Sequence, residues 1–169
     1  MNLYGFAGGD PINFSDPFGL TPAPLVAAGA FVVRNWRAIS AVGAIGIRGA
    51  RVMNEARNIV ASPQMETLRN AAQRGQQAVV QVGQRTISYE PDLPTSGMTW
   101  AERGFHLGKE AFSSQGELTK TVLHELHRLS VGSVAGNAAT SQAAAAETQA
   151  AASFAEKAYN LGRALGIWK

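Results

Sequence analysis

Cysteine is absent from this 169-residue chain, and aspartate is scarce. Without cysteine the chain has no disulfide, no thiolate ligand for zinc and no cysteine nucleophile. After residue 20 the only aspartate is Asp92, which disfavours the clustered carboxylates that hold magnesium in many nucleases. The sequence also lacks a glycine-rich phosphate loop before a helix and the histidine and cysteine spacings of zinc deaminases. We therefore expect no metal and no other cofactor.

A strong charge of one sign and long apolar runs are lacking as well. The chain has 15 Lys and Arg against 12 Asp and Glu, a net charge of +3. This balance is too small to argue for nucleic acid by itself, so no nucleic-acid partner is expected. No uninterrupted apolar run reaches ~18 residues, the length of a standard membrane-spanning helix, and the first residues show no secretion-signal pattern. With 46% hydrophobic and 16% charged residues, the composition suits a folded or membrane-competent chain.

The first twenty residues form a turn-rich segment with widely spaced aromatic residues. Asp-Pro occurs at Asp10 and again at Asp16, and proline restricts the residue before it to extended conformations. The segment reads N-L-Y-G-F at 2–6, D-P-I-N-F at 10–14 and D-P-F-G-L at 16–20. In this spacing it resembles the C-terminal signature of the Rhs repeat-associated core. The resemblance covers residues 2–20 only.

That resemblance implies an effector that cuts itself. Rhs proteins build a β-cocoon around a variable C-terminal toxin, and the core ends with an aspartyl self-cleavage step. By resemblance, Asp16 is one carboxylate of the cleaving pair, the partner aspartate lies upstream of this chain, and the bond between Leu20 and Thr21 is cut. Two carboxylates are needed because a pair can share one proton and activate a water molecule. The resemblance therefore implies that residues after 20 are toxin cargo.

The segment 21–75 combines a proline-containing linker with apolar helices. Arg34, Arg37, Arg48 and Arg51 fall within an arc of about 100° on a helical wheel, beside Trp36, and most of the remaining surface is apolar or small. Two interpretations stay open. Either a hydrophobic helical hairpin packs on the domain with its arginines in water, or the segment enters a bilayer with its arginines at lipid phosphates or at water.

The segment 76–169 predicts a small sheet covered by helices. β-forming residues at 77–82 and 86–90 flank a Gly-containing turn, and 98–101 and 105–107 flank a second one, so two hairpins are expected. Helices are expected near 65–73, 115–131 and 138–168. The predicted fold class is α+β and mostly helical: an apolar helical segment followed by a small antiparallel sheet covered by helices. The expected divisions are 1–20, 21–75 and 76–169.

The helix at 115–131 carries the residues that most suggest a catalytic or metal-binding site. His124-Glu125 is similar to the start of H-E-x-x-H, in which two histidines grip zinc and the glutamate activates water. Arg128 occupies the second ligand position, and arginine has no lone pair for a metal, which argues against a zinc protease. Glu147 falls on the apolar face of the last helix and needs a partner there. Two alternatives remain, a structural salt bridge or a site made of His124, Glu125, Arg128 and Glu147.

The sequence alone favours membrane attack. The chain most resembles the pore-forming type of Rhs toxin, which would be delivered by type VI secretion, released after Leu20, and inserted as a homo-oligomer into the target cytoplasmic membrane. Its partners would be the parent cocoon, a cognate immunity protein and membrane lipids. The alternative is an intracellular toxin enzyme, a hydrolase or transferase, that uses the His124, Glu125, Arg128 and Glu147 cluster.

Overall fold

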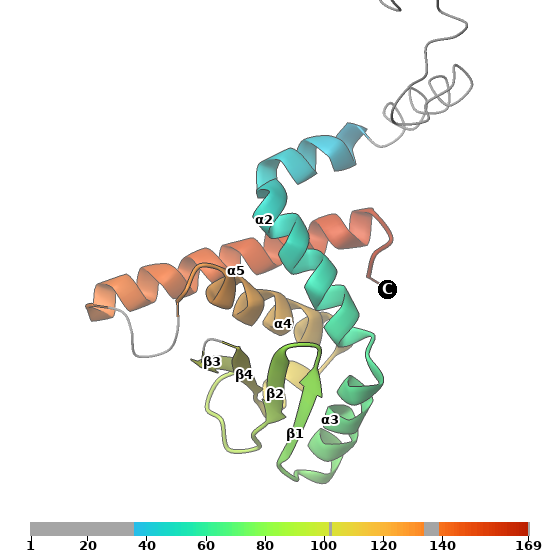
Figure 1. Cartoon of the computed structure of the whole chain (residues 1–169), viewed down its shortest axis with the longest axis vertical. Coiled ribbons are helices and arrows are strands. Elements are labelled where there is room, and N and C mark those ends of the chain that lie inside the picture. The colour runs from blue at the N-terminus through green and yellow to red at the C-terminus, as the bar shows by residue number, and fades with distance from the viewer. Residues whose placement is uncertain (1–35, 102, 134–138, 169) are drawn as a thin grey trace, which may run out of the picture. The chain divides into compact units, whose positions relative to one another are not determined.

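A computed structural model describes residues 36–101, 103–133 and 139–168 (Figure 1). The chain divides into two compact units, Met1–Ile39 and Ser40–Lys169, and the sheet and its covering helices belong to the second. The elements are α2 (Trp36–Val60), α3 (Pro63–Arg74), β1 (Ala78–Val82), β2 (Arg85–Tyr89), β3 (Gly97–Ala101), β4 (Gly104–Leu107), η2 (Lys109–Phe112), α4 (Gln115–Ser130) and α5 (Ser141–Ala164). The fold class is α+β, as the sequence predicts, with helices packed against a small sheet.

Some residues singled out in the sequence lie outside the described part. Asp16, Leu20, Thr21 and Arg34 precede it, and the side chains of 36–45, which include those of Trp36 and Arg37, are not described. The self-cleavage step and the bilayer-facing role of these residues therefore stay predictions.

The helices begin and end at residues whose side chains or backbone suit the position. The Ser62 hydroxyl accepts a hydrogen bond from the Met65 amide at 3.2 Å, and Pro63 takes the first helical position of α3. Gly75 ends the same helix at φ 63°, a left-handed conformation that favours glycine. The sequence offers Ser113 or Ser114 as the cap of α4, and in the structure the Ser114 hydroxyl accepts from the Glu117 amide at 3.0 Å.

The sheet is mixed, with the strand order β1-β2-β4-β3. Both predicted hairpins, β1–β2 and β3–β4, are antiparallel, but β2 and β4 pair in parallel. The prediction of a purely antiparallel sheet was therefore wrong at its centre. The loop after β2 leads to β3 at the edge of the sheet, and the chain then returns as β4 between β3 and β2. The second hairpin therefore lies in the sheet with β4, its second strand, beside β2. Backbone hydrogen bonds from Glu90 to Leu107 and from Gly108 to Ser96 hold this arrangement.

One face of the sheet lies against the core. By register, the inward rows are Val80, Ile87, Phe105 and Thr99, and Ala78, Tyr89, Leu107 and Gly97. Helix α3 packs on β1 and β2, and α4 packs on β3. Leu68 and Met65 of α3 and Leu118, Val122 and Leu126 of α4 are fully or almost fully buried against this face. Helix α5 packs along α4 and adds Ala155 and Ala158 to the core.

Helix α2 contributes to the core and is broken at one residue. Val52, Met53, Ala56 and Ile59 are buried in the main cluster. Gly46 has φ 71° and ψ 173°, so two helical pieces meet there. Arg34 and the side chain of Arg37 lie outside the described residues, so the arginine arc across residues 34–51 stays a prediction. Within the described residues, no helix combines the length and the apolar character needed to cross a membrane.

The C-terminal tryptophan belongs to the core. Trp168 is 9% exposed, and its indole Nε1 donates to the Ala158 carbonyl at 3.5 Å. A Cβ atom placed on Gly162 would lie 1.8 Å from that nitrogen. Glycine at 162 is thus what allows the indole to lie directly on α5, so this residue closes the core.

Candidate functional site

Helix α4 places its polar side chains along one edge of its buried face. Thr121, His124, Glu125 and Arg128 recur at intervals of three and four residues, the spacing of neighbours on a helix surface. The adjoining face is occupied by the leucines and valine that pack on the sheet. The polar edge therefore faces the gap between α4, α5 and the start of β3.

A cavity of about 590 Å³ occupies this gap. We call it the α4 cleft. It is lined by Thr95, Ser96, Gly97, Met98, Glu117, Lys120, Thr121, His124, Glu125, Arg128, Thr148, Ala152, Ala155 and Glu156. Three of the four residues of the predicted cluster thus share one cavity.

Glu125 is the most buried ionisable group of the cleft. Its side chain is 2% exposed, and the Thr99 hydroxyl donates to its Oε2 at 2.5 Å. Burial raises the pKa of Glu125 above its ordinary 4.5, against the opposing effects of the Thr99 hydrogen bonds and the Arg128 charge. Oε2 accepts from Thr99, and the other carboxyl oxygen, Oε1, lies 4.0 Å from His124 Nε2.

His124 stands beside this carboxyl group and reaches the cleft. Its side chain is 19% exposed. Burial lowers the pKa of His124 to about 4, and the positive charge of Arg128 and the neighbouring His127 contribute to the decrease. The imidazole is therefore neutral near pH 7 and has a lone pair with which it can accept a proton.

Arg128 brings the third functional group. Its charge acts on both His124 and Glu125. Its Nε atom is buried and has no hydrogen-bond partner within the described residues. A buried donor without an acceptor is costly, and the Arg128 side chain also lines the cleft.

Lys120 closes the rim of the cleft between α4 and α5. Its ammonium lies 2.6 Å from Glu117 Oε1 and 3.8 Å from Glu156 Oε2. The hydrogen bond to Glu117 raises the pKa of Lys120, and the charge of Glu156 adds to this effect. The ammonium is thus neutralised by two carboxylates. Arg128 is therefore the cation of the cleft that is better placed to bind an anionic ligand.

Glu147 has a different partner from those expected. Its Oε2 accepts a hydrogen bond from the Ser133 hydroxyl, beyond the end of α4, and it does not line the α4 cleft. From the sequence, Arg128, His124 or an arginine of the first helix could pair with Glu147, and the hydrogen-bond partner in the structure is instead Ser133. The reason is local: the turn after α4 brings a serine to the carboxylate.

Two residues of the site were not found from the sequence. Thr99 is fully buried on the inward face of β3, and its hydroxyl donates a hydrogen bond to Glu125. Gly97 lies so close to α4 that a Cβ atom there would be 2.7 Å from Thr121 Cγ2 and 2.8 Å from Glu125 Oε1. The sequence carried one signal for each residue. Thr99 is a polar residue at an inward position of a strand, and Gly97 is a glycine at the start of that strand.

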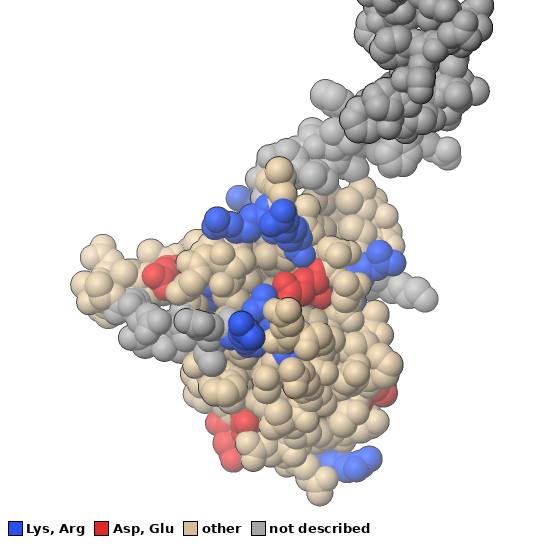
Figure 2. Space-filling view, viewed as in Figure 1, with Lys and Arg blue, Asp and Glu red and all other residues tan. Residues whose placement is uncertain are grey.

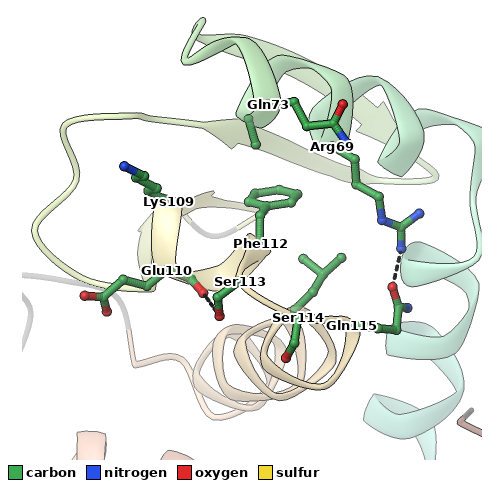
Figure 3. A pocket seen from close by; sticks show the side chains of 10 residues that line it. Arg69, Gln73, Lys109, Glu110, Phe112, Ser113, Ser114 and Gln115 are labelled. Atoms are coloured by element: carbon green, nitrogen blue, oxygen red, sulfur yellow. Dashed lines mark hydrogen bonds between the residues drawn. The ribbon is translucent and has the colours of Figure 1, made fainter.

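A larger cavity, of about 720 Å³, lies between α3, η2 and the start of α4 (Figure 3). Its arginine is already paired: Arg69 donates to Gln115 Oε1 at 2.8 Å and to Glu66 Oε2 at 3.1 Å. Figure 3 shows Arg69 pointing to Gln115 across the cavity, with Phe112 between the walls. No histidine lines it. Size alone therefore does not make it the better candidate.

Across residues 36–101, 103–133 and 139–168, no three His, Asp or Glu side chains come close enough together to hold a metal ion.

No protein-family model, curated protein or solved structure matches the chain.

Proposed function

We propose that this chain is the C-terminal toxin of an Rhs-type effector and that its folded domain acts as an enzyme through the α4 cleft. The observation that carries the enzymatic part is that His124, Glu125 and Arg128 line one cavity. The Rhs-like signature at residues 2–20 supports the toxin part, since the segment after such a signature is cargo.

The three groups divide the work of a hydrolase or transferase. Neutral His124 accepts the proton of the attacking hydroxyl, and Arg128 binds the oxygen on which negative charge develops. Glu125, which lines the same cavity 4.0 Å from His124, is the group placed to donate a proton to the leaving group. Two titratable neighbours whose pKa values move apart, as those of Glu125 and His124 do, are typical of an acid–base pair.

The test is growth arrest by the full chain expressed in a sensitive bacterium. We expect His124→Asn and Arg128→Gln to abolish arrest with an unchanged circular dichroism spectrum. The matched control is Arg57→Gln, because Arg57 is exposed on α2 and does not line the α4 cleft. Arrest by His124→Asn as strong as that of the natural chain would contradict the proposal.

Pore formation is the second candidate, and one described feature favours it. Arg48 and Arg51 are exposed on α2, and Ile47 beside them is 77% exposed. An exposed apolar side chain flanked by arginines suits an interfacial helix. Release of dye from vesicles of bacterial lipid, lost in Arg48→Gln/Arg51→Gln and retained in His124→Asn, would replace the enzyme with a pore.

A further inference from the structure

One face of the sheet points away from the core side chains of α3 and α4. By register its rows are Val79, Ser88, His106 and Met98, and Gln81, Thr86, Gly104 and Ala101. We call it the open face. Val79 is 62% exposed and Met98 36%. Helices α3 and α4 contact inward residues of the opposite face, so the strands present this one outward.

Trp100 lies flat on the open face. Its ring stacks on His106 with centroids 5.5 Å apart and planes 24° apart. A Cβ atom on Gly104 would lie 2.7 Å from the indole Nε1, so glycine at 104 leaves room for the ring over β4. Trp100 is 50% exposed, so half of its surface remains accessible to solvent. A flat, half-exposed indole on a sheet is a platform on which an unpaired base can stack.

An exposed arginine lies at the end of the sheet next to this platform. Arg103 is exposed and directly precedes Gly104, over which the Trp100 ring lies. The Thr86 amide donates to the Arg103 carbonyl at 3.1 Å, and Arg85 is bound to Glu55 of α2 at 2.6 Å, so this end of the sheet adjoins α2. Figure 2 shows Lys and Arg atoms gathered over α2, while the surface where Figure 1 draws the strands carries few charged atoms. This arrangement suits phosphates beside the sheet and bases on it.

The open face leads into the α4 cleft. Met98 pairs with His106 in register and also lines the cleft with His124 and Arg128. A strand stacked on Trp100 therefore has a short path along β3 to the acid–base pair.

We propose that the substrate of the α4 cleft is single-stranded RNA, held by stacking on Trp100 and by Arg103. This inference rests on the proposed enzymatic function and differs from the expectation, drawn from net charge, that nucleic acid is no partner. RNA suits the cleft because it carries its own nucleophile, the 2′-hydroxyl next to each phosphodiester, so that one base, one acid and one cation suffice.

The reaction is a transesterification without change of oxidation state. His124 accepts the proton of the 2′-hydroxyl while its oxygen forms a bond to phosphorus. The bond from phosphorus to the 5′-oxygen breaks, and Glu125 donates a proton to that oxygen. Arg128 binds a non-bridging phosphoryl oxygen throughout. The products are a 2′,3′-cyclic phosphate and a 5′-hydroxyl end.

Binding tests the platform separately from cleavage. We would titrate the full chain, as His124→Asn to prevent cleavage, into a labelled single-stranded RNA of ~12 nucleotides. Adding Trp100→Ala is expected to weaken the Kd by about 5- to 150-fold, the usual range for loss of one stacked base. Val131→Ala, exposed at the end of α4 and outside both the open face and the cleft, is the matched control and should leave the Kd unchanged. Arg103→Gln should lower the salt dependence of binding.

Cleavage tests the chemistry. The natural chain is expected to cut the RNA to cyclic-phosphate ends and to leave the same sequence in DNA intact. Equal cutting of DNA, or RNA binding unaffected by Trp100→Ala, would overturn the inference. If the natural chain neither binds nor cuts RNA while growth arrest still depends on His124, the proposed RNA substrate is wrong and the proposed enzymatic function is retained. If arrest does not depend on His124 either, both proposals fall.

Discussion

The contact between Thr99 and Glu125 gives the sharpest test of how the site is built. Thr99→Val replaces a fully buried hydroxyl by a methyl group of nearly the same size, so it removes the 2.5 Å hydrogen bond without leaving a cavity. Leaving a buried acceptor without its donor costs about 1–3 kcal/mol. We therefore expect the free energy of unfolding in urea to fall by that amount at pH 7. Thr148→Val is the control, because Thr148 lines the same cleft but is exposed.

A double-mutant cycle separates this contact from general damage. Glu125→Leu alone strands the Thr99 hydroxyl, whereas Thr99→Val/Glu125→Leu replaces both partners by apolar groups, which is much less costly. The coupling between the two positions should reach at least about 1 kcal/mol. Effects that add to within ~0.5 kcal/mol would refute the reasoning, because additivity is the behaviour of sites that do not interact.

The same variant has a defined pH dependence. Burial raises the pKa of Glu125 in the folded chain, so the folded chain binds this proton more tightly than the unfolded chain. The stabilising contribution is complete below pH 4.5 and is lost as the pH rises through the folded pKa. The Thr99 hydroxyl opposes the rise in this pKa, so Thr99→Val should extend the loss to higher pH and cost more stability at pH 8 than at pH 4.

Three further predictions concern acid stability, packing and a helix end. His124 has a pKa lowered to about 4, so its contribution is present above pH 6.5 and lost as the pH falls through 6.5 toward 4; His124→Asn should flatten the Tm over that range, and an unchanged slope would contradict this. Gly162→Ala forces Trp168 off α5 and should cost about 1–3 kcal/mol in urea unfolding, with a shift of tryptophan fluorescence. Gly75→Ala places a side chain at φ 63° and should cost about 1–2 kcal/mol, although no atom obstructs its Cβ; no loss would show that the helix end adjusts freely.

Local signals in the sequence predicted local structure well. Ser114 with Glu117 three residues later marked the start of α4, and Ser62-Pro63 marked that of α3. The spacing of His124 and Arg128 placed both on one face of a helix, and the structure brings both into one cleft. In each case residues a few positions apart determine the outcome, which is why the pattern was sufficient.

Features that depend on distant segments were missed. The parallel pairing of β2 with β4 joins two hairpins, each of which is consistent with several sheet orders. Thr99 and Glu125 are 26 residues apart in the sequence, and neither position alone indicates the other. Glu147 was assigned an arginine or histidine partner on charge, but the turn after α4 supplied Ser133 instead. The sequence left open whether residues 25–60 form one helix or two and did not place the break at Gly46, because a glycine within a helical pattern does not by itself show which φ it adopts.

The strand order also bears on when the site forms during folding. Strand β4 pairs with β2 although a loop and strand β3 separate the two in the sequence, so this pairing needs a long loop to close. Helix α4 and the β1–β2 hairpin need only contacts between residues close in the sequence. Pairings between distant segments form slowly because loop closure precedes their gain. Thr99 and Gly97 are on the hairpin that joins by this pairing, so Glu125 acquires its donor late. A chain with its helices formed and this hairpin undocked would thus lack an assembled cleft, and slow hydrogen exchange at the β4 amides would mark the moment at which the cleft is complete.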